Sequence, residues 1–407
     1  MATETGPIPL SRNQIVEPYQ IEGDAYAWGK VARVFTEPAF LKVYNENPTR
    51  DLVCLDAPSS YPHYRQIMVG QHRQRMLNEA RRFGGMFFDT FQEVRKNKLP
   101  IATNLDRDDF IAIVKMLGPR KLPARQLLNS AIFELMVNPP PQEDRNTETV
   151  SNYLFDRFIN SDEVIETVVE PDGKQGDKGN WVFLKPTSVR DVYPDIQAET
   201  LYEILSSTLG DRSVDFLKAT ADYLADYLVT SGNFRRVTFL SLDRKPLRQL
   251  VMEAKNTFPP KMQNTLFFQS AQDGRRHLLA DLLCIPFANE SIDFFTSTEG
   301  WPYHFKDHGI RGNREIALRL ANLLTPGGKA VFFPWKMDQN TSYSQEILRT
   351  IVKDWEDMGF AVERESRTKK EVLDLMTDRE FILADHSPLF KQSGLVTVLT
   401  LSKPSLQ

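Results

Sequence analysis

Acidic, tyrosine and histidine side chains that could take part in binding or catalysis lie at the predicted ends of buried strands. Asp243 closes the apolar run RVTFLSL, and Asp281 closes the run HLLA. Glu299, Tyr303 and His304 follow a third run, and such side chains can bind or deprotonate a hydroxyl group. Ligands of open α/β sheets bind at the carboxyl ends of the strands. These residues therefore predict a ligand site at one edge of a parallel sheet.

Each of these features also has an ordinary structural interpretation. An acid such as Asp281 at a strand end can simply cap the element that follows it. The segment 296–305, TSTEGWPYHF, can be a packed aromatic loop with a surface histidine. His304 and His308 have no cysteine or well-spaced acid beside them, so the sequence predicts no metal site.

The elements that would position these residues alternate between strand and helix. From Leu278 to Trp335 the order is strand, loop, strand, helix, Pro-Gly-Gly turn and strand. The alternation extends in both directions, with strands predicted at 236–242, 265–269, 360–365 and 395–401, and helices at 246–256, 311–323, 344–358 and 369–376. This pattern indicates an α/β fold with a seven-stranded, mostly parallel sheet.

Two motifs carry a family resemblance. The first is an acid followed by a Pro-Phe pair and an Ile-Asp pair, and the second is a Pro-Gly-Gly turn. In this chain they are Asp281, Pro286-Phe287 and Ile292-Asp293, then Pro326-Gly327-Gly328 after Leu324. Over residues 212–402 the chain resembles the class I S-adenosylmethionine-dependent methyltransferases. The resemblance implies a Rossmann-like sheet whose last strand runs antiparallel beside the fifth.

The same resemblance implies a cofactor and roles for the candidate residues. S-adenosylmethionine is the cofactor of the family, and Asp281, next to Leu282, would lie beside the adenine. The loop after the fourth strand would face a small-molecule methyl acceptor. Glu299, Tyr303 and His304 are therefore the predicted catalytic residues.

The family's glycine-rich loop after the first strand has no clear counterpart, so two registers stay open. In the first register, 236–242 is the first strand and Leu242-Asp243-Arg244-Lys245 stands at the loop. In the second, that run is the second strand, Asp243 holds the ribose hydroxyls, and 200–205 is the first strand. The first register assigns seven strands without surplus. Asp243, with Leu242, is a predicted cofactor residue in both.

Two classes of function follow from this departure. In the first, the protein is a divergent methyltransferase that aligns a small-molecule nucleophile with the sulfonium methyl group. In the second, the fold is kept without methyl transfer, and the chain is a binding or scaffold subunit or catalyses another reaction. The missing glycines favour the second class, and the acid and Pro-Gly-Gly motifs favour the first.

Three segments are predicted along the chain. Residues 1–20 form a flexible lead, 21–195 a mainly helical domain with a hairpin near 165–185, and 196–407 the methyltransferase-like domain. The helical domain is expected to serve as a substrate lid, a homodimer interface or a platform for a protein partner. Basic and acidic residues are mixed along it, so we do not expect nucleic acid as a partner.

Composition narrows the class of protein. Hydrophobic residues make up 41% and charged residues 26% of the chain, and the net charge is −4, as in ordinary globular proteins that do not attract nucleic acid. Cys54 and Cys284 are expected to be buried, reduced thiols. The chain begins without a signal-peptide pattern and has no apolar run long enough for a membrane helix. We therefore expect a cytoplasmic protein.

Overall fold

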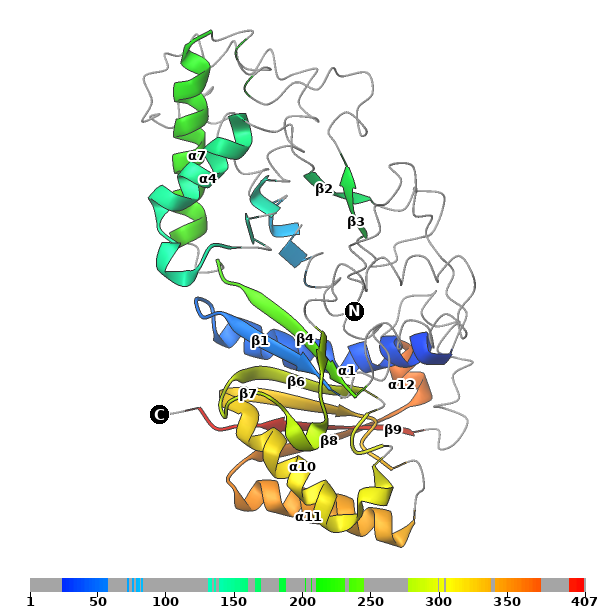
Figure 1. The fold of residues 1–407 in the computed structure, drawn as a ribbon. Coiled ribbons are helices and arrows are strands. Elements are labelled where there is room, and N and C mark those ends of the chain that lie inside the picture. Colours follow the sequence, from blue (N-terminus) through cyan, green and yellow to red (C-terminus); the bar gives the residue numbers. More distant parts are fainter. Residues whose placement is uncertain are drawn as a thin grey trace, which may run out of the picture.

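The computed structural model describes residues 24–57, 139–159, 165–169, 183–187, 210–230, 234–244, 277–298, 300–303, 305–337, 341–374 and 395–405, with single positions at 72–82, 131–136, 202 and 206. Seven of the described strands form one sheet in the order β5-β4-β1-β6-β7-β9-β8 (Figure 1). They are β1 (Leu52–Asp56), β4 (Val237–Asp243), β5 (His277–Leu279), β6 (Ile292–Thr298), β7 (Leu324–Phe333), β8 (Ala361–Thr368) and β9 (Leu395–Ser402).

The direction of the strands confirms the predicted fold class. β5, β4, β1, β6 and β7 are parallel, and β9 is inserted antiparallel between β7 and β8. The last strand therefore lies beside the fifth parallel strand, as the sequence resemblance implies. The sheet is Rossmann-like.

Helices cover both faces of this sheet, which gives three layers. On one face lies α1 (Asp24–Glu46), and on the other lie α10 (Gly309–Leu323) and α11 (Ser342–Asp357) (Figure 1). β6 shows why both faces need a cover, because six successive side chains from Ile292 to Ser297 are buried. A strand buried on both sides reads as a continuous apolar run rather than an alternating one.

The side chains of the sheet divide between two hydrophobic cores. Phe294 of β6 packs with Phe35 and Phe40 of α1, and its chain neighbour Phe295 packs on the opposite face with α10 and α11. The second core is rich in large rings, which are those of Trp301, Phe332, Trp335 and Trp355. Trp355 also donates its ring N–H to the carbonyl of Ala317, 3.0 Å away, so α11 is fixed to α10.

The remaining described elements lie outside the sheet. They are α4 (Thr147–Ile159), α7 (Arg212–Thr230), α12 (Lys369–Asp374), the short helices η1 (Gln142–Asp144), η3 (Leu282–Cys284) and η4 (Lys306–His308), and the strands β2 (Ile165–Val169) and β3 (Phe183–Thr187). α4 packs along α7, and β2 pairs antiparallel with β3 as the predicted hairpin. None of the described helices has the length and apolar character needed to cross a membrane.

The first strand corrects both registers considered from the sequence. β1 is the run LVCLD at 52–56, and it lies at the centre of the sheet. The run that ends at Asp243 is its neighbour β4, so the first register is wrong about the first strand. The second register is right that this run is the second strand, but it is wrong about the first, because β1 has that place and Tyr202, the described residue within 200–205, is helical. The sheet thus includes a strand from within 21–195, and the predicted strand 265–269 lies outside the described residues.

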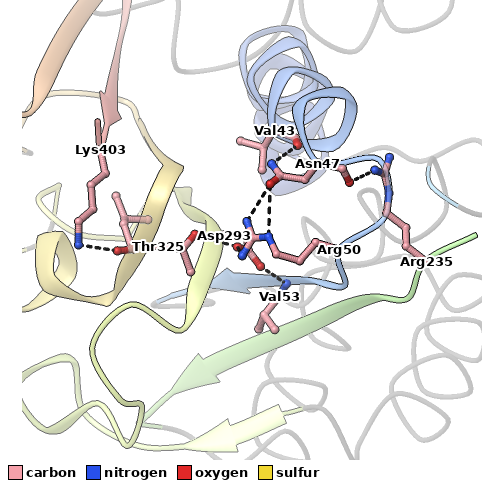
Figure 2. Close-up of polar contacts among 9 residues, drawn as sticks. Val43, Asn47, Arg50, Val53, Arg235, Asp293, Thr325 and Lys403 are labelled. Atoms are coloured by element: carbon pink, nitrogen blue, oxygen red, sulfur yellow. Dashed lines mark hydrogen bonds and ion pairs between the residues drawn. The ribbon is translucent and has the colours of Figure 1, made fainter. Parts of the chain in front are cut away.

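A network of polar contacts joins the elements at the amino edge of the sheet (Figure 2). Asp293, 2% exposed, accepts hydrogen bonds from the Val53 N–H and the Thr325 hydroxyl, both at 2.8 Å. It also forms an ion pair with Arg50 at 2.7 Å. The Arg50 guanidinium donates to Asn47 at the end of α1, at 3.1 and 3.3 Å. One buried carboxylate therefore holds β1, β6 and β7 in register.

A second acid at this edge ties the chain beyond β1 to the sheet. Asp51 accepts two hydrogen bonds from Arg145, at 2.5 and 2.8 Å, and a third from the Arg236 N–H at 2.8 Å. Burial alone would raise the pKa of Asp51, but these hydrogen bonds outweigh it and the pKa is lowered. Arg145 lies between η1 and α4, so this ion pair anchors the segment that follows the Pro-rich stretch.

The Pro-Gly-Gly turn has a local steric cause. Gly327 has φ of +77°, a conformation that side chains rarely adopt. A Cβ on Gly328 would come within 2.8 Å of the Thr325 carbonyl oxygen. Both glycines are therefore needed for β7 to begin beside Asp293.

Candidate functional site

The candidate site is the crevice beyond the carboxyl ends of β1 and β6. From β1 the chain moves outward to β4 and β5, and it then returns to β6 on the other side of β1. The strand order therefore reverses between β1 and β6. Open α/β sheets bind their ligands at such a reversal, outside the carboxyl ends of the strands. This argument depends on topology alone.

Asp56 ends β1 at this point, and the sequence analysis did not select it. Asp56 is 4% exposed and accepts a hydrogen bond at 2.9 Å from the hydroxyl of Thr296 on β6. The backbone N–H of Ala57 also donates to the Thr296 carbonyl at 2.9 Å. These bonds fix the ends of β1 and β6 to one another. The signal for Asp56 is an acid that closes the short apolar run LVCL.

The two acids selected from the sequence lie on the next strands outward. Asp243 is the last residue of β4 and is 8% exposed. Its carbonyl accepts a hydrogen bond from the Ala280 N–H at 3.0 Å, so Asp281 follows directly beyond the neighbouring strand end. Asp281 also receives the Leu283 N–H at 2.9 Å and thereby caps η3. Both predicted roles of Asp281, cap and strand-end acid, thus coincide in one residue.

Arg244 affects whether the Asp281 carboxylate is available to a ligand. Its guanidinium forms an ion pair with the Asp281 carboxylate, and both side chains are partly exposed. Surface pairs of this kind contribute about 0–1 kcal/mol, so the contact is readily exchanged for another partner. Leu242 and Leu282, the other predicted cofactor residues, are 0% and 2% exposed in the second core. Their side chains pack, so the part that either can offer to a ligand is its backbone.

The loop after the first strand also needs correction. The sequence analysis placed the bulky residues Leu242 to Lys245 at the glycine loop, but that segment follows the second strand. The residues after β1 read Ala57-Pro58-Ser59-Ser60. They include no glycine, yet Ala and Ser are small enough to let a ligand approach the backbone. The bulky residues 242–245 therefore do not occupy the position after the first strand.

The loop after β6 is anchored in the core. Trp301 is 1% exposed and donates its ring N–H to Asn313 of α10 at 2.9 Å. Asn313 in turn donates to the carbonyls of Phe305 and Gly309, both at 2.8 Å. The predicted packed aromatic loop is therefore present around Trp301. Tyr303 is half-buried, and Glu299 and His304 lie outside the described residues.

Lys336 lies beside Tyr303, and the sequence analysis did not select it. Its ammonium nitrogen is 5.7 Å from the centroid of the Tyr303 ring. Burial lowers the pKa of Lys336. On β6, the hydroxyls of Ser297 and Thr298 are buried and make no hydrogen bond within the described part of the chain. Unsatisfied buried hydroxyls are unusual in proteins, and an ordered water molecule commonly completes their bonding.

The two cysteines and the side chains that could bind a metal ion are less suited to form a functional site. Cys54 is buried, and burial together with the nearby Asp293 raises the pKa of its thiol well above the usual value. Cys284 is exposed, contrary to the sequence prediction, because only Leu282 of η3 turns into the core. Within the described ranges, no three His, Cys, Asp or Glu side chains form a group suited to a metal ion.

Comparison with known proteins returns structures only. No family model and no curated protein matches the chain. Among solved structures, a putative sarcosine dimethylglycine methyltransferase from Galdieria sulphuraria shares 14% identity over 44% of this chain and 74% of its own, at a TM-score of 0.24. A Haemonchus contortus phosphoethanolamine N-methyltransferase bound to S-adenosylhomocysteine shares 13% sequence identity with this chain. The match covers 45% of this chain and 46% of the other, at a TM-score of 0.25. The [4+2]-cyclase SpnF shares 11% sequence identity over 42% of this chain and 67% of its own, at a TM-score of 0.22.

These likenesses are too distant to decide an activity. The fold itself follows from the strand order and the antiparallel β9, which belong to this chain. It is an α/β fold of the methyltransferase type.

Proposed function

We propose that the protein is an S-adenosylmethionine-dependent methyltransferase with a small-molecule acceptor. The observation that carries the proposal is the row of three acids at the carboxyl edge. Asp56, Asp243 and Asp281 follow β1, β4 and β5, which are adjacent parallel strands next to the reversal of strand order. A nucleoside with two ribose hydroxyls and an amino group offers donors that three carboxylates can accept.

The donor and acceptor groups at this edge fit such a cofactor. Asp243 would hold the ribose hydroxyls, because it ends the second strand of the topological order. Asp281 would accept from the adenine amino group once Arg244 releases it. The sequence after β1 includes the small side chains of Ala57, Ser59 and Ser60, which would leave the backbone there accessible to the methionine part.

When bound, the cofactor supplies an electrophilic methyl group on a sulfonium sulfur. The chain would then need to hold the acceptor nucleophile in line with that methyl group, because alignment provides most of the rate acceleration in such transfers. The loop after β6 and the end of β7 are suited to this, since Trp301 and Trp335 fix them in the second core. Tyr303 projects from the same loop and would contact the acceptor.

Calorimetric titration of the full chain with S-adenosylmethionine and S-adenosylhomocysteine tests the proposal. We expect micromolar binding of both, and transfer of a labelled methyl group from S-adenosylmethionine to a component of a small-molecule extract. Asp243→Asn should lose affinity, whereas Asp215→Asn, an exposed acid on α7, should bind like the unchanged protein. Binding without transfer to any component would leave a cofactor-binding protein rather than a transferase.

A second candidate is favoured by one contact. The Arg244–Asp281 ion pair occupies the acid that would meet the adenine. In a protein that has kept the fold without methyl transfer, this pair would be permanent. Failure of the full chain to bind either ligand would support this second function, with the chain acting as a binding subunit or catalysing another reaction.

A further inference from the structure

Lys336 and Tyr303 come together because two neighbouring strands end side by side. β6 and β7 are parallel, with Thr298 opposite Phe333 at their last paired residues. Tyr303 follows the end of β6 and Lys336 follows the end of β7. Both side chains therefore lie beyond the carboxyl edge, on the far side of β6 from the three acids.

The backbone holds Lys336 in a fixed position. Its chain neighbours Trp335 and Met337 are 4% and 2% exposed and belong to the second core. The Trp335 N–H also donates to the Thr397 carbonyl of β9 at 2.7 Å. A lysine flanked by two buried residues cannot swing away with a flexible loop. Its ammonium group is presented from a rigid support, as binding sites require.

The charge of Lys336 has no matching acid in the described structure. Its contacts there are the Tyr303 ring and a backbone hydrogen bond from its own N–H to the Pro334 carbonyl. Burial lowers the pKa of Lys336, and no described carboxylate opposes that effect. The buried Lys329 of β7 differs in this respect, because Glu46 and Glu363 partly restore its pKa. A half-buried ammonium group is stabilised by an anion close to it, and the described residues supply none.

We propose that Lys336, together with Tyr303, binds an anionic group of the methyl acceptor, either a carboxylate or a phosphate. This inference rests on the proposed function, since it specifies the acceptor of that same site. The ammonium group pairs with the anion, and the Tyr303 ring packs against the apolar part of the acceptor. The hydroxyls of Ser297 and Thr298, which make no hydrogen bond with the described residues, lie at the same end of β6.

Anion titration of the full chain tests this assignment. The probes are inorganic phosphate and acetate, each added at constant ionic strength, and the readout is the fluorescence of the tryptophans, two of which flank the site. We expect a saturable change with one of the two anions, which identifies the class of acceptor. In Lys336→Gln the affinity should fall by about tenfold or more, the usual loss for a charge-assisted contact. Lys336→Arg, which keeps the charge, should retain most of it.

Two controls separate this proposal from the proposed function. Lys353→Gln, an exposed lysine on α11, should leave the anion response unchanged. Lys336→Gln should bind S-adenosylhomocysteine like the unchanged protein, which also shows that it is folded. An anion response that is absent, unsaturable or equal in Lys336→Gln overturns the subsite even when the cofactor binds. A Lys336-dependent response without any cofactor binding keeps the anion site and overturns the methyltransferase.

Discussion

The two edges of the sheet differ in how many partners their polar side chains have. At the amino edge, Asp293 has three partners, a backbone N–H, a hydroxyl and an arginine. At the carboxyl edge, the hydroxyls of Ser297 and Thr298 are unsatisfied within the described structure, and Lys336 has no carboxylate there. The carboxylate of Asp293 is thus fully engaged, although the Nε of Arg235 on the same edge is buried without a hydrogen-bond partner among the described residues. The carboxyl edge keeps bonding capacity that the described residues do not use.

This contrast bears on how a structural acid differs from an acid proposed to bind a ligand. Asp293 lies near the start of β6 and Asp243 at the end of β4, and both are nearly buried. Burial therefore does not distinguish them. The edges differ in the polar groups that the described residues leave unused, which are two hydroxyls at the carboxyl edge and the Nε of Arg235 at the amino edge.

The largest effect is expected from breaking the amino edge. Asp293→Ala removes a buried carboxylate and leaves the Arg50 charge and two donors without their acceptor. We expect the free energy of unfolding to fall by about 2–4 kcal/mol, because the Val53 N–H and the Thr325 hydroxyl lose their acceptor, whereas Arg50 is partly exposed. Urea unfolding measures this. Asp354→Ala breaks a more exposed pair with Arg314 and should cost less than about 1 kcal/mol. A loss for Asp293→Ala as small as that of Asp354→Ala would contradict the contrast.

An intermediate effect is expected where β1 meets β6. Thr296→Val keeps the shape of the side chain but removes the donor to the buried Asp56, so it should cost about 1–3 kcal/mol. Ser297→Ala on the same strand removes a hydroxyl that has no partner in the described structure. It should be neutral or slightly stabilising. Equal losses in the two variants would show that Ser297 is satisfied after all.

Acid sensitivity at the amino edge should be smaller. The lowered pKa of Asp51 means that its contribution to stability is present above the ordinary value of 3.8 and is lost as the pH falls through the lower folded value. Asp51→Asn should cost less than about 1 kcal/mol at neutral pH, because the carboxylate is partly exposed. Urea unfolding over a pH series should show the two proteins converging below 3.8. A constant difference at every pH would exclude this ion pair as the cause.

The smallest effect on stability is expected from Arg244→Gln. This change removes an exposed ion pair, so the free energy of unfolding should shift by about 0.5 kcal/mol or less. If Arg244 competes with the adenine for Asp281, the variant should bind S-adenosylhomocysteine a few times more tightly in calorimetry. Weaker binding would instead make Arg244 part of the cofactor site.

Local signals account for what the sequence predicted well. β6, α10, β7, α11, β8 and β9 lie within a few residues of their predicted ranges, because each run is bounded by a turn or a cap. Gly327 with its positive φ and Thr341, which caps α11 through the Ser344 N–H, are such boundaries. Asp243 and Asp281 were found for the same reason, since each closes an apolar run.

Distant partners account for what the sequence did not show. β1 is only five residues long, and periodicity cannot distinguish so short an apolar run from part of a helix. Its assignment depends on β4 and β6, which lie far along the chain. Lys336 is unremarkable in the sequence, because its significance depends on its burial and on the lack of a described carboxylate beside it in space.

The position of β1 has a consequence for synthesis of the protein. Val53 and Asp293, which bond one another across β1 and β6, are 240 residues apart in the chain. At ribosomal rates of about 5–20 residues per second, roughly 10–50 seconds pass between them. Until β4 emerges at residues 237–243, the apolar side chains Leu52 and Leu55 have no neighbouring strand to pair with. A fragment that ends before residue 237 therefore holds β1 without either neighbouring strand.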